Sequence, residues 1–326
     1  MIVVVVPEPM PWEAELRRTL PDDTVVFSPG VVHLASRAKD ALWSRARTDR
    51  RMWTRFARRR VVDVLAARWL PREARVVYAP SLGAERTFAV ARQRGVETVL
   101  IHDLPCMREL HEDLDLAARR YPDCVFLRRF RAPRAVLAQQ EVERVLADRV
   151  MARAGYASEL LRARGVTEER LVPLSERPHP GVHASAPART GRGGGSATML
   201  LAGFAAARSG SNEALQALER RPHVTLLVRA GEGVEPRRLL AHRQVRIATI
   251  AERQELSGVD AVLAPSWCES HPMEVARAFA GGVPVIGTRR AMGGRTPARA
   301  VEPGDAQGLG LAIDAVLGER EAMAPG

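Results

Sequence analysis

Residues Asp260 to Thr288, DAVLAPSWCESHPMEVARAFAGGVPVIGT, decide the fold class of this chain. The apolar run Ala261 to Ala264 has no polar alternation, which is typical of a parallel strand covered on both faces. Pro272 stands near the first position of a helical pattern that ends at Gly282. Val283 to Ile286 follows as the next strand. The stretch therefore predicts a strand, a loop, a helix and a second strand in series.

A lone acid, Glu269, lies between the first of these strands and the start of the helix. Open α/β sheets bind ligands beyond the carboxyl ends of their strands, and a phosphate can sit on the free amides of a helix start. Glu269 is therefore a candidate ligand-binding residue. The alternative is a helix-leading acid that accepts hydrogen bonds from backbone amides alone.

Length and composition predict two domains. A chain of 326 residues with 46% hydrophobic residues can fill two cores. Residues 1–172 are expected to form one α/β half and residues 198–326 a second, each of them Rossmann-like. Residues 173–197 are rich in proline and glycine and predict a linker. Two such halves are expected to face a cleft.

Apolar runs and helical spacing place the elements of both halves. Strands are expected near Ile2–Val6, Thr24–Phe27, Arg75–Tyr78, Thr98–Ile101, Arg149–Ala152, Met199–Ala202, Val224–Val228 and Val245–Ile250. Helices of the second half are expected at Asn212–Arg220, around Arg237–His242 and at Gln307–Leu317. Strands that alternate with helices in this way predict parallel sheets.

The cysteines and the amino terminus favour a protein of the reducing cytoplasm. Cys106, Cys124 and Cys268 lie far apart and form no CxxC pair, which argues against a disulfide framework and a zinc site. Cys268 is expected to be a small buried hydrophobe, because no partner base is evident. The opening MIVVVVP predicts a buried strand rather than a signal peptide, and no apolar run reaches membrane-spanning length.

The formal net charge of +11 comes almost entirely from arginine, with Lys39 as the only lysine. We interpret this charge as a solvated arginine surface. Nucleic-acid binding is not expected, because the sequence holds no RNP, zinc-finger or repeat pattern that would support it.

Arg47 to Arg60 form the sharpest basic cluster, with seven arginines around Trp53 and Phe56. Val61, Val64 and Leu65 follow at helical spacing, so the segment predicts a basic amphipathic helix. We expect its apolar stripe in the core and its arginines in water. The alternative is peripheral contact with an anionic membrane, at the inner face of that membrane.

Together these segments resemble the retaining glycosyltransferases of the GT-B fold, and family 4 (glycosyl transferases group 1) in particular, over most of the chain. The family's run of strand, Pro-Ser, Glu, alanine-rich helix, Gly-x-Pro-Val and Gly-Gly loop matches Pro265, Ser266, Glu269, Ala278, Ala280, Gly282, Pro284, Val285, Gly293 and Gly294. Further matches are Thr98–Pro105 (TVLIHDLP), the passage Ala147–Val172 with Ser158, Gly165 and Val166, and the turn Glu302 to Asp305. Each match is weak alone, but together and in order they are specific.

The resemblance implies transfer of a sugar from a nucleotide-diphosphate sugar to a hydroxyl acceptor, with retention and without a metal or other cofactor. The leaving phosphate takes the acceptor's proton in such enzymes, so positioning and electrostatics supply most of the catalysis. Carried over to this sequence, Glu269 hydrogen-bonds hydroxyls of the donor sugar. The amides of Ser270, His271 and Met273 face the diphosphate.

In the first half, the resemblance places His102 near the transferred sugar and Asp103 beside it as a supporting polar group. The acidic run Asp113 to Asp115 lies in a helical stretch. We expect it to be a solvated helix face rather than a metal motif.

The charged donor contacts depart from the family pattern. The second family glutamate, which binds the ribose, aligns with Arg277, and Glu274 lies three residues earlier, almost one helical turn away. The loop that carries an arginine and a lysine in the family has Gly203-Phe204 and Arg208-Ser209 here. Arg208 is a candidate substitute because its planar fork suits phosphate; the alternative is a solvent-facing loop arginine.

These departures leave two alternatives to an active glycosyltransferase. One is a catalytically impaired GT-B-fold protein that acts as a binding or partner subunit. The other is an epimerase-like enzyme that acts on nucleotide sugars.

Overall fold

The computed structural model describes residues 1–6, 24–27, 48–103, 105–124, 127, 131–153, 155–174, 196–204, 206–229, 239, 241–249, 252–253, 256–268, 270 and 272–322. For residues 48–55, 204 and 320–322 it describes the backbone alone. Glu269 and His271 lie outside the described residues.

The chain divides into two compact units. Met1–Arg108, Arg131–Ala154 and Ser158–Arg177 form the first, and Glu109–Phe130, Gly155–Ala157 and Pro178–Gly326 form the second. The expected linker, residues 173–197, lies largely outside the described residues, so the domain boundaries given above stay a prediction.

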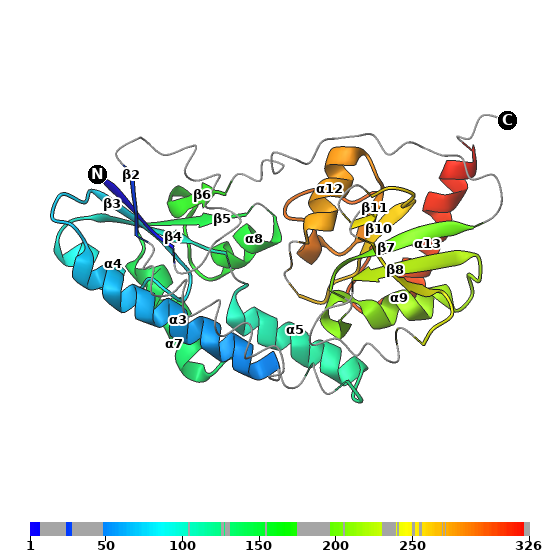
Figure 1. Ribbon diagram of the computed structural model, residues 1–326, viewed down its shortest axis with the longest axis horizontal. Coiled ribbons are helices and arrows are strands. Elements are labelled where there is room, and N and C mark those ends of the chain that lie inside the picture. Colours follow the sequence, from blue (N-terminus) through cyan, green and yellow to red (C-terminus); the bar gives the residue numbers. More distant parts are fainter. Residues whose placement is uncertain are drawn as a thin grey trace. The chain divides into compact units, whose positions relative to one another are not determined.

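The first unit is built on six parallel strands in the order β2-β1-β3-β4-β5-β6 (Figure 1). They are β1 (Ile2–Val5), β2 (Thr24–Phe27), β3 (Val76–Pro80), β4 (Glu97–Ile101), β5 (Arg149–Ala152) and β6 (Leu171–Pro173). The helices are α3 (Thr48–Trp69), α4 (Glu85–Gln93), α7 (Arg134–Leu146), α8 (Tyr156–Ala163), which belongs to this unit from Ser158 on, and the short η1 (Glu168–Arg170). The strands predicted for this half are all present, and β3 runs on to Pro80.

The second unit has its own sheet of six parallel strands, in the order β12-β11-β10-β7-β8-β9. They are β7 (Ala197–Phe204), β8 (Val224–Arg229), β9 (Val245–Ile247), β10 (Ala261–Ala264), β11 (Val285–Gly287) and β12 (Arg299–Ala300). The helices are α5 (Met107–Arg120), which belongs to this unit from Glu109 on, α9 (Ser211–Leu218), α12 (Met273–Gly281) and α13 (Ala306–Ala322), with η2 (Ala207–Ser209) and η3 (Arg289–Ala291). The helix expected around Arg237–His242 lies mostly outside the described residues.

Helices cover both faces of the second sheet, which explains its uninterrupted apolar strands. Successive residues of a strand point to opposite faces. Leu201 packs in a cluster with Leu218 of α9, whereas its neighbour Leu200 packs in another with Ala278 of α12. Figure 1 shows α9 and α12 on opposite sides of the sheet. The interpretation of Ala261 to Ala264 as a strand buried on both faces is therefore confirmed.

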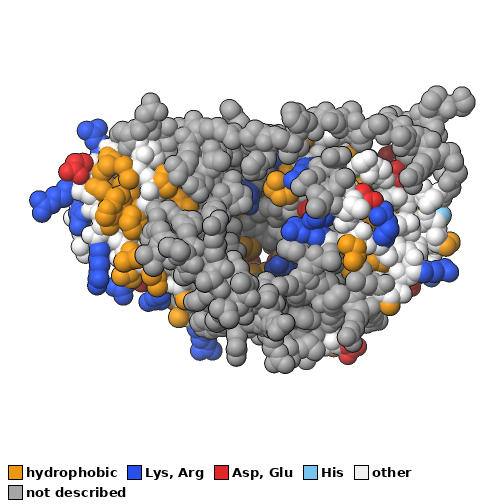
Figure 2. Space-filling view, viewed as in Figure 1, with side chains coloured by type: hydrophobic (Ala, Val, Ile, Leu, Met, Phe, Trp, Pro, Cys, Tyr) orange, Lys and Arg blue, Asp and Glu red, His pale blue; other side chains and the backbone are white. Residues whose placement is uncertain are grey.

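Helix α3 corrects in part the expectation that its arginines lie in water and its apolar stripe in the core. Phe56 is buried, but Arg59 is buried as well, with 0% of its surface exposed. Val61 and Leu65 are exposed, at 54% and 39%. Figure 2 shows hydrophobic side chains gathered over the first unit, with basic side chains around them. Arg59 faces inward because it pairs with Asp103. Local sequence does not reveal this partner, so the sequence predicted a different buried face.

Candidate functional site

The carboxyl ends of β7 and β10 bring several predicted site residues together. The two strands pair in parallel, with Leu263 opposite Leu201, so both end at the same edge of the sheet. Gly203 near the end of β7 donates its amide to Glu274 Oε2 at 3.3 Å. A Cβ on Gly203 would lie 3.7 Å from Cβ of Pro272, the residue that caps α12. Gly203 and the first turn of α12 are therefore direct neighbours.

Within that first turn, Met273 and Glu274 differ in exposure. Met273 is exposed at the start of α12, where a helix leaves amides without partners inside the helix. Glu274 is buried, and its carboxylate accepts the Gly203 amide. A carboxylate held in this way fixes the end of β7 against α12.

Arg277, one turn further along α12, is directed elsewhere. Its Nη1 donates to the carbonyl oxygen of Arg253 at 3.0 Å. The structure therefore does not bring Arg277 to the Gly203–Glu274 contact. Its predicted part in donor binding stays a prediction.

The loop after β10 is held by a hydrogen bond within itself and by bonds to η2 and to the residue after β11. Ser266 Oγ donates to the carbonyl of Cys268 at 2.9 Å and lies 3.2 Å from the carbonyl of Arg208. The Trp267 amide donates to that same Arg208 carbonyl at 2.9 Å, and Thr288 Oγ1 donates to the Ser266 carbonyl at 2.8 Å. Cys268 is buried, as predicted. Rigid backbone at the strand end is what an ordered ligand site needs.

The same loop leaves no room for a side chain at Gly210. Its φ is +83°, and a Cβ there would lie 2.2 Å from the carbonyl oxygen of Pro265. The neighbouring Arg208 has an exposed side chain on η2 and gives its carbonyl to the loop. Its predicted role as a phosphate clamp is untested by this geometry.

Trp267 anchors the loop in the interior of the second unit. Its Nε1 donates to Glu213 Oε1 at 2.7 Å, and its ring meets that of Tyr121 edge to face, with centroids 6.4 Å apart. Burial raises the pKa of Glu213, although hydrogen bonds to its carboxylate act in the opposite direction. Sequence patterning did not single out any of these three residues.

Arg290 contacts both this loop and α5. Its Nη1 donates to Asp113 Oδ1 at 2.5 Å and to the carbonyl of Trp267, and its guanidinium lies 5.4 Å from the ring centre of Tyr156. The Ser270 amide, expected to face a diphosphate, donates to the Arg290 carbonyl at 3.1 Å. The predicted part of Ser270 in donor binding stays a prediction.

Asp113 is the second correction. It was expected on a solvated helix face, but it is buried and ion-paired with Arg290. Burial raises the pKa of Asp113 to about 6, and Arg290 opposes that shift. Asp115, two residues on, is exposed as expected.

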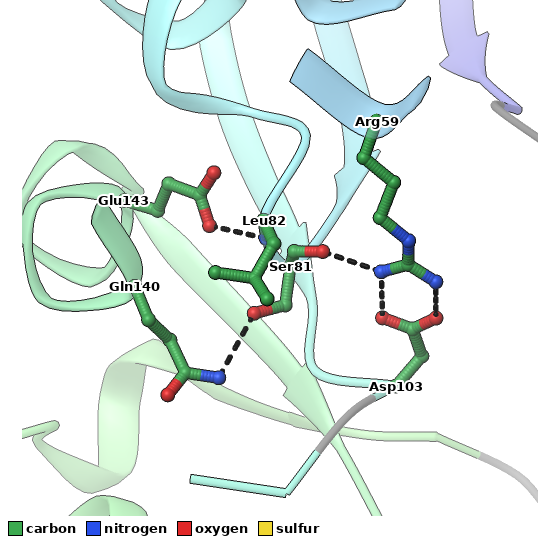
Figure 3. Close-up of polar contacts among 6 residues, drawn as sticks. All are labelled: Arg59, Ser81, Leu82, Asp103, Gln140 and Glu143. Atoms are coloured by element: carbon green, nitrogen blue, oxygen red, sulfur yellow. Dashed lines mark hydrogen bonds and ion pairs between the residues drawn. The ribbon is translucent and has the colours of Figure 1, made fainter. Parts of the chain in front are cut away.

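In the first unit, His102 and Asp103 follow β4. The His102 amide donates to the carbonyl of Met151 at 2.8 Å, and its buried ring places Nε2 3.8 Å from Cys106 Sγ. The Asp103 carboxylate accepts two hydrogen bonds from Arg59, at 3.1 and 2.8 Å (Figure 3). Arg59 also donates to the Ser81 carbonyl at 2.5 Å.

Figure 3 shows that the turn after β3 is held from its other side by α7. Glu143 accepts the amides of Leu82 at 2.6 Å and of Ala84 at 2.9 Å, and Gln140 Nε2 donates to Ser81 Oγ at 3.2 Å. Leu82 has a φ of +65°, which a branched side chain rarely adopts. Burial raises the pKa of Glu143 to about 7, against the amide donors that favour its ionised form. The sequence signalled none of this network.

The described residues hold neither a candidate metal centre nor a membrane-spanning helix. No group of three His, Cys, Asp or Glu side chains there could hold a metal ion. Among the helices that the structure describes, none is long and apolar enough to cross a membrane.

Comparison with known proteins identifies the fold. No protein-family model and no curated protein matches the sequence. Among solved structures, HepE of Anabaena in complex with UDP and glucose matches at 13% identity and a TM-score of 0.58, over 98% of this chain and 90% of that one. The chain has the GT-B fold.

Two further glycosyltransferase structures support this assignment. The lipopolysaccharide outer core galactosyltransferase WaaB matches at 14% identity and a TM-score of 0.57, over 98% of this chain and 91% of that one. A UDP-forming trehalose-phosphate synthase from Burkholderia vietnamiensis matches at 14% identity and a TM-score of 0.58, over 98% of this chain and 93% of that one. The predicted α/β class with two Rossmann-like domains is confirmed.

Proposed function

We propose that this chain transfers a sugar from a nucleotide-diphosphate sugar to a hydroxyl acceptor, with retention and without a metal. The observation that carries the proposal is the contact of Gly203 with α12 at the shared carboxyl edge of β7 and β10. Ligands of open α/β sheets bind at such an edge, and a helix start there suits a phosphate. The fold shared with HepE, solved with UDP and glucose, supports the same activity.

The proposed chemistry needs little from side chains. The acceptor oxygen bonds to the anomeric carbon as the bond from that carbon to the phosphate oxygen breaks, and the acceptor proton passes to the leaving diphosphate. The protein holds the diphosphate and stabilises its developing charge. In this proposal Glu269 binds hydroxyls of the donor sugar, the start of α12 at Met273 faces the diphosphate, and His102 acts near the transferred sugar.

Thermal unfolding in the presence of nucleotide-diphosphate sugars tests the proposal. One donor should raise the Tm, because a ligand at about 100 times its Kd stabilises the folded state by about 2.7 kcal/mol. The Glu269→Ala variant should lose that shift. Glu302→Ala removes an exposed glutamate of the same unit and should keep it.

An impaired protein that serves as a partner subunit is the second candidate. Glu274 is bound to the Gly203 amide and Arg277 to the Arg253 carbonyl, so both candidates for the ribose contact are already engaged. Absence of a Tm shift with every donor, together with stable co-purification of another protein, would favour this candidate. Release of free UDP or GDP from a donor would exclude it, and formation of an epimeric nucleotide sugar would indicate an epimerase.

Contact with an anionic membrane through α3 is proposed on a separate observation. Val61, Leu65 and Trp69 are all exposed and lie four residues apart, on one face of the helix. The exposed Arg60 and Arg68 lie beside them. An apolar stripe flanked by arginines suits the surface of an anionic bilayer.

Vesicle pelleting checks this contact. The double variant Val61→Ser, Leu65→Ser should bind anionic vesicles at least about thirtyfold less well, because each lost apolar side chain removes more than about 1 kcal/mol of burial. Val145→Ser, which alters an exposed valine on α7, is the matched control and should bind like the original protein. Equal binding by all three proteins would rule out the α3 stripe as the contact.

A further inference from the structure

Arg290 lies at the same edge of the second sheet as the candidate site. β11 pairs in parallel with β10, with Gly287 opposite Ala264, and η3 follows β11 directly. The Arg290 side chain therefore starts beyond the carboxyl end of the sheet. From there it reaches the carbonyl of Trp267 in the loop between β10 and α12.

The proposed function assigns the diphosphate to the start of α12, where this loop ends. Arg290 touches the loop twice, through its guanidinium at Trp267 and through its carbonyl at the Ser270 amide. Its side chain keeps 22% of its surface exposed, so an anion from solvent can reach it. At the two positions where the family resemblance implies a charged clamp, this chain has Phe204 and Ser209, which are uncharged.

In the structure, Arg290 is paired with a carboxylate of the protein itself, that of Asp113. Asp113 Oδ1 lies 2.5 Å from Arg290 Nη1 and is buried on α5. Carboxylate and phosphate oxygens are equivalent acceptors for a guanidinium fork. A diphosphate carries more charge than a carboxylate and can compete for the guanidinium. Burial raises the pKa of Asp113 to about 6, so the displaced carboxyl can take up a proton instead of staying as an unpaired buried charge.

We propose that Arg290 is a binding residue for the donor diphosphate, and that Asp113 occupies its guanidinium until the diphosphate replaces it. This inference rests on the proposed function, because it concerns the same donor. It assigns the missing cationic contact to η3 rather than to Arg208. The Arg290 guanidinium lies over the ring of Tyr156, and this contact keeps the guanidinium plane in place during the exchange.

Calorimetric titration with UDP and with inorganic pyrophosphate tests the proposal on the full-length protein. Arg290→Met should weaken the binding of both ligands by about 10- to 100-fold, the value of a lost charge-assisted hydrogen bond. Asp113→Asn should tighten both by severalfold, because the competing anion is gone. Asp113→Ser provides a second, smaller replacement in case the amide disturbs folding.

Two neighbouring residues provide matched controls. Arg289→Met removes an exposed arginine from the same short helix, and Asp115→Asn neutralises an exposed aspartate on α5. Both should bind UDP and pyrophosphate like the original protein. They separate the effect of the Arg290–Asp113 pair from a general change of charge.

Three outcomes would overturn the proposal. If the pair only fastens α5, both Asp113 variants will weaken binding along with Arg290→Met. If Arg290→Met binds like the original protein, the diphosphate contacts another cation, and the proposed function stands without this inference. If the original protein binds neither UDP nor pyrophosphate, the proposed function fails together with it.

Discussion

Replacement of Arg59 by methionine is expected to lower the free energy of unfolding by about 3–5 kcal/mol, the cost of breaking a buried ion pair from one side. Arg59 is fully buried, and Asp103 keeps 5% of its side chain exposed. Methionine retains the aliphatic stem but leaves the Asp103 carboxylate and the Ser81 carbonyl without their donor. Urea unfolding of the full-length protein, with the midpoint and slope compared, measures the loss.

Two further variants show whether the lost partner is the cause. Arg60→Met alters the exposed neighbour and should change stability by no more than about 0.5 kcal/mol. The double variant Arg59→Met, Asp103→Asn removes the unpaired charge and should recover part of the loss. If Arg59→Met is as stable as Arg60→Met, the ion pair contributes nothing and the account is wrong.

The fold could be predicted because its signals are local. Ala261 to Ala264 needs no distant information to indicate a doubly covered strand, and Pro272 and Gly282 mark where α12 begins and ends. In parallel α/β sheets, the carboxyl ends of neighbouring strands share one edge. For this reason the meeting of Gly203 with the start of α12 also follows the sequence-based expectation.

The burial of charged residues could not be predicted, because it depends on distant partners. Arg59 meets Asp103, which is 44 residues away, and Arg290 meets Asp113, which is 177 residues away. Within α3, Arg59 and Arg60 are alike as sequence, yet one is buried and the other exposed. Which face of a helix turns inward is decided by such a partner as much as by apolar spacing.

The contacts of the candidate site residues could not be predicted from the sequence. Glu274 and Arg277 were weighed as ribose ligands, but the structure gives each a backbone partner, Gly203 and Arg253. Such bonds depend on where loops end in space, and no spacing along the chain encodes them. Arg290 was missed for the same reason, because its neighbours Trp267 and Asp113 come from separate elements.

Glu143 is expected to make the stability of this protein fall as pH rises from about 4.5 to 7. Burial raises the pKa of Glu143 from 4.5 to about 7 in the folded state. Over that range the unfolded chain ionises at this residue while the folded chain keeps its proton, so the proton stabilises the folded state at the acid end. This difference in pKa corresponds to about 3 kcal/mol of stability, which is lost by neutral pH.

The Glu143→Gln variant isolates this contribution because glutamine does not titrate. The free energy of unfolding of the original protein, minus that of the variant, should decrease by about 3 kcal/mol between pH 4.5 and 7.5. Glu141→Gln is the matched control on α7: Arg108 lowers the pKa of Glu141, so its titration falls below this range. If the difference for Glu143→Gln stays constant with pH, Glu143 has the same pKa in the folded and the unfolded chain and is ionised at neutral pH. Its carboxylate would then be stabilised fully by the amides of Leu82 and Ala84, and the turn after β3 would be held by a charge.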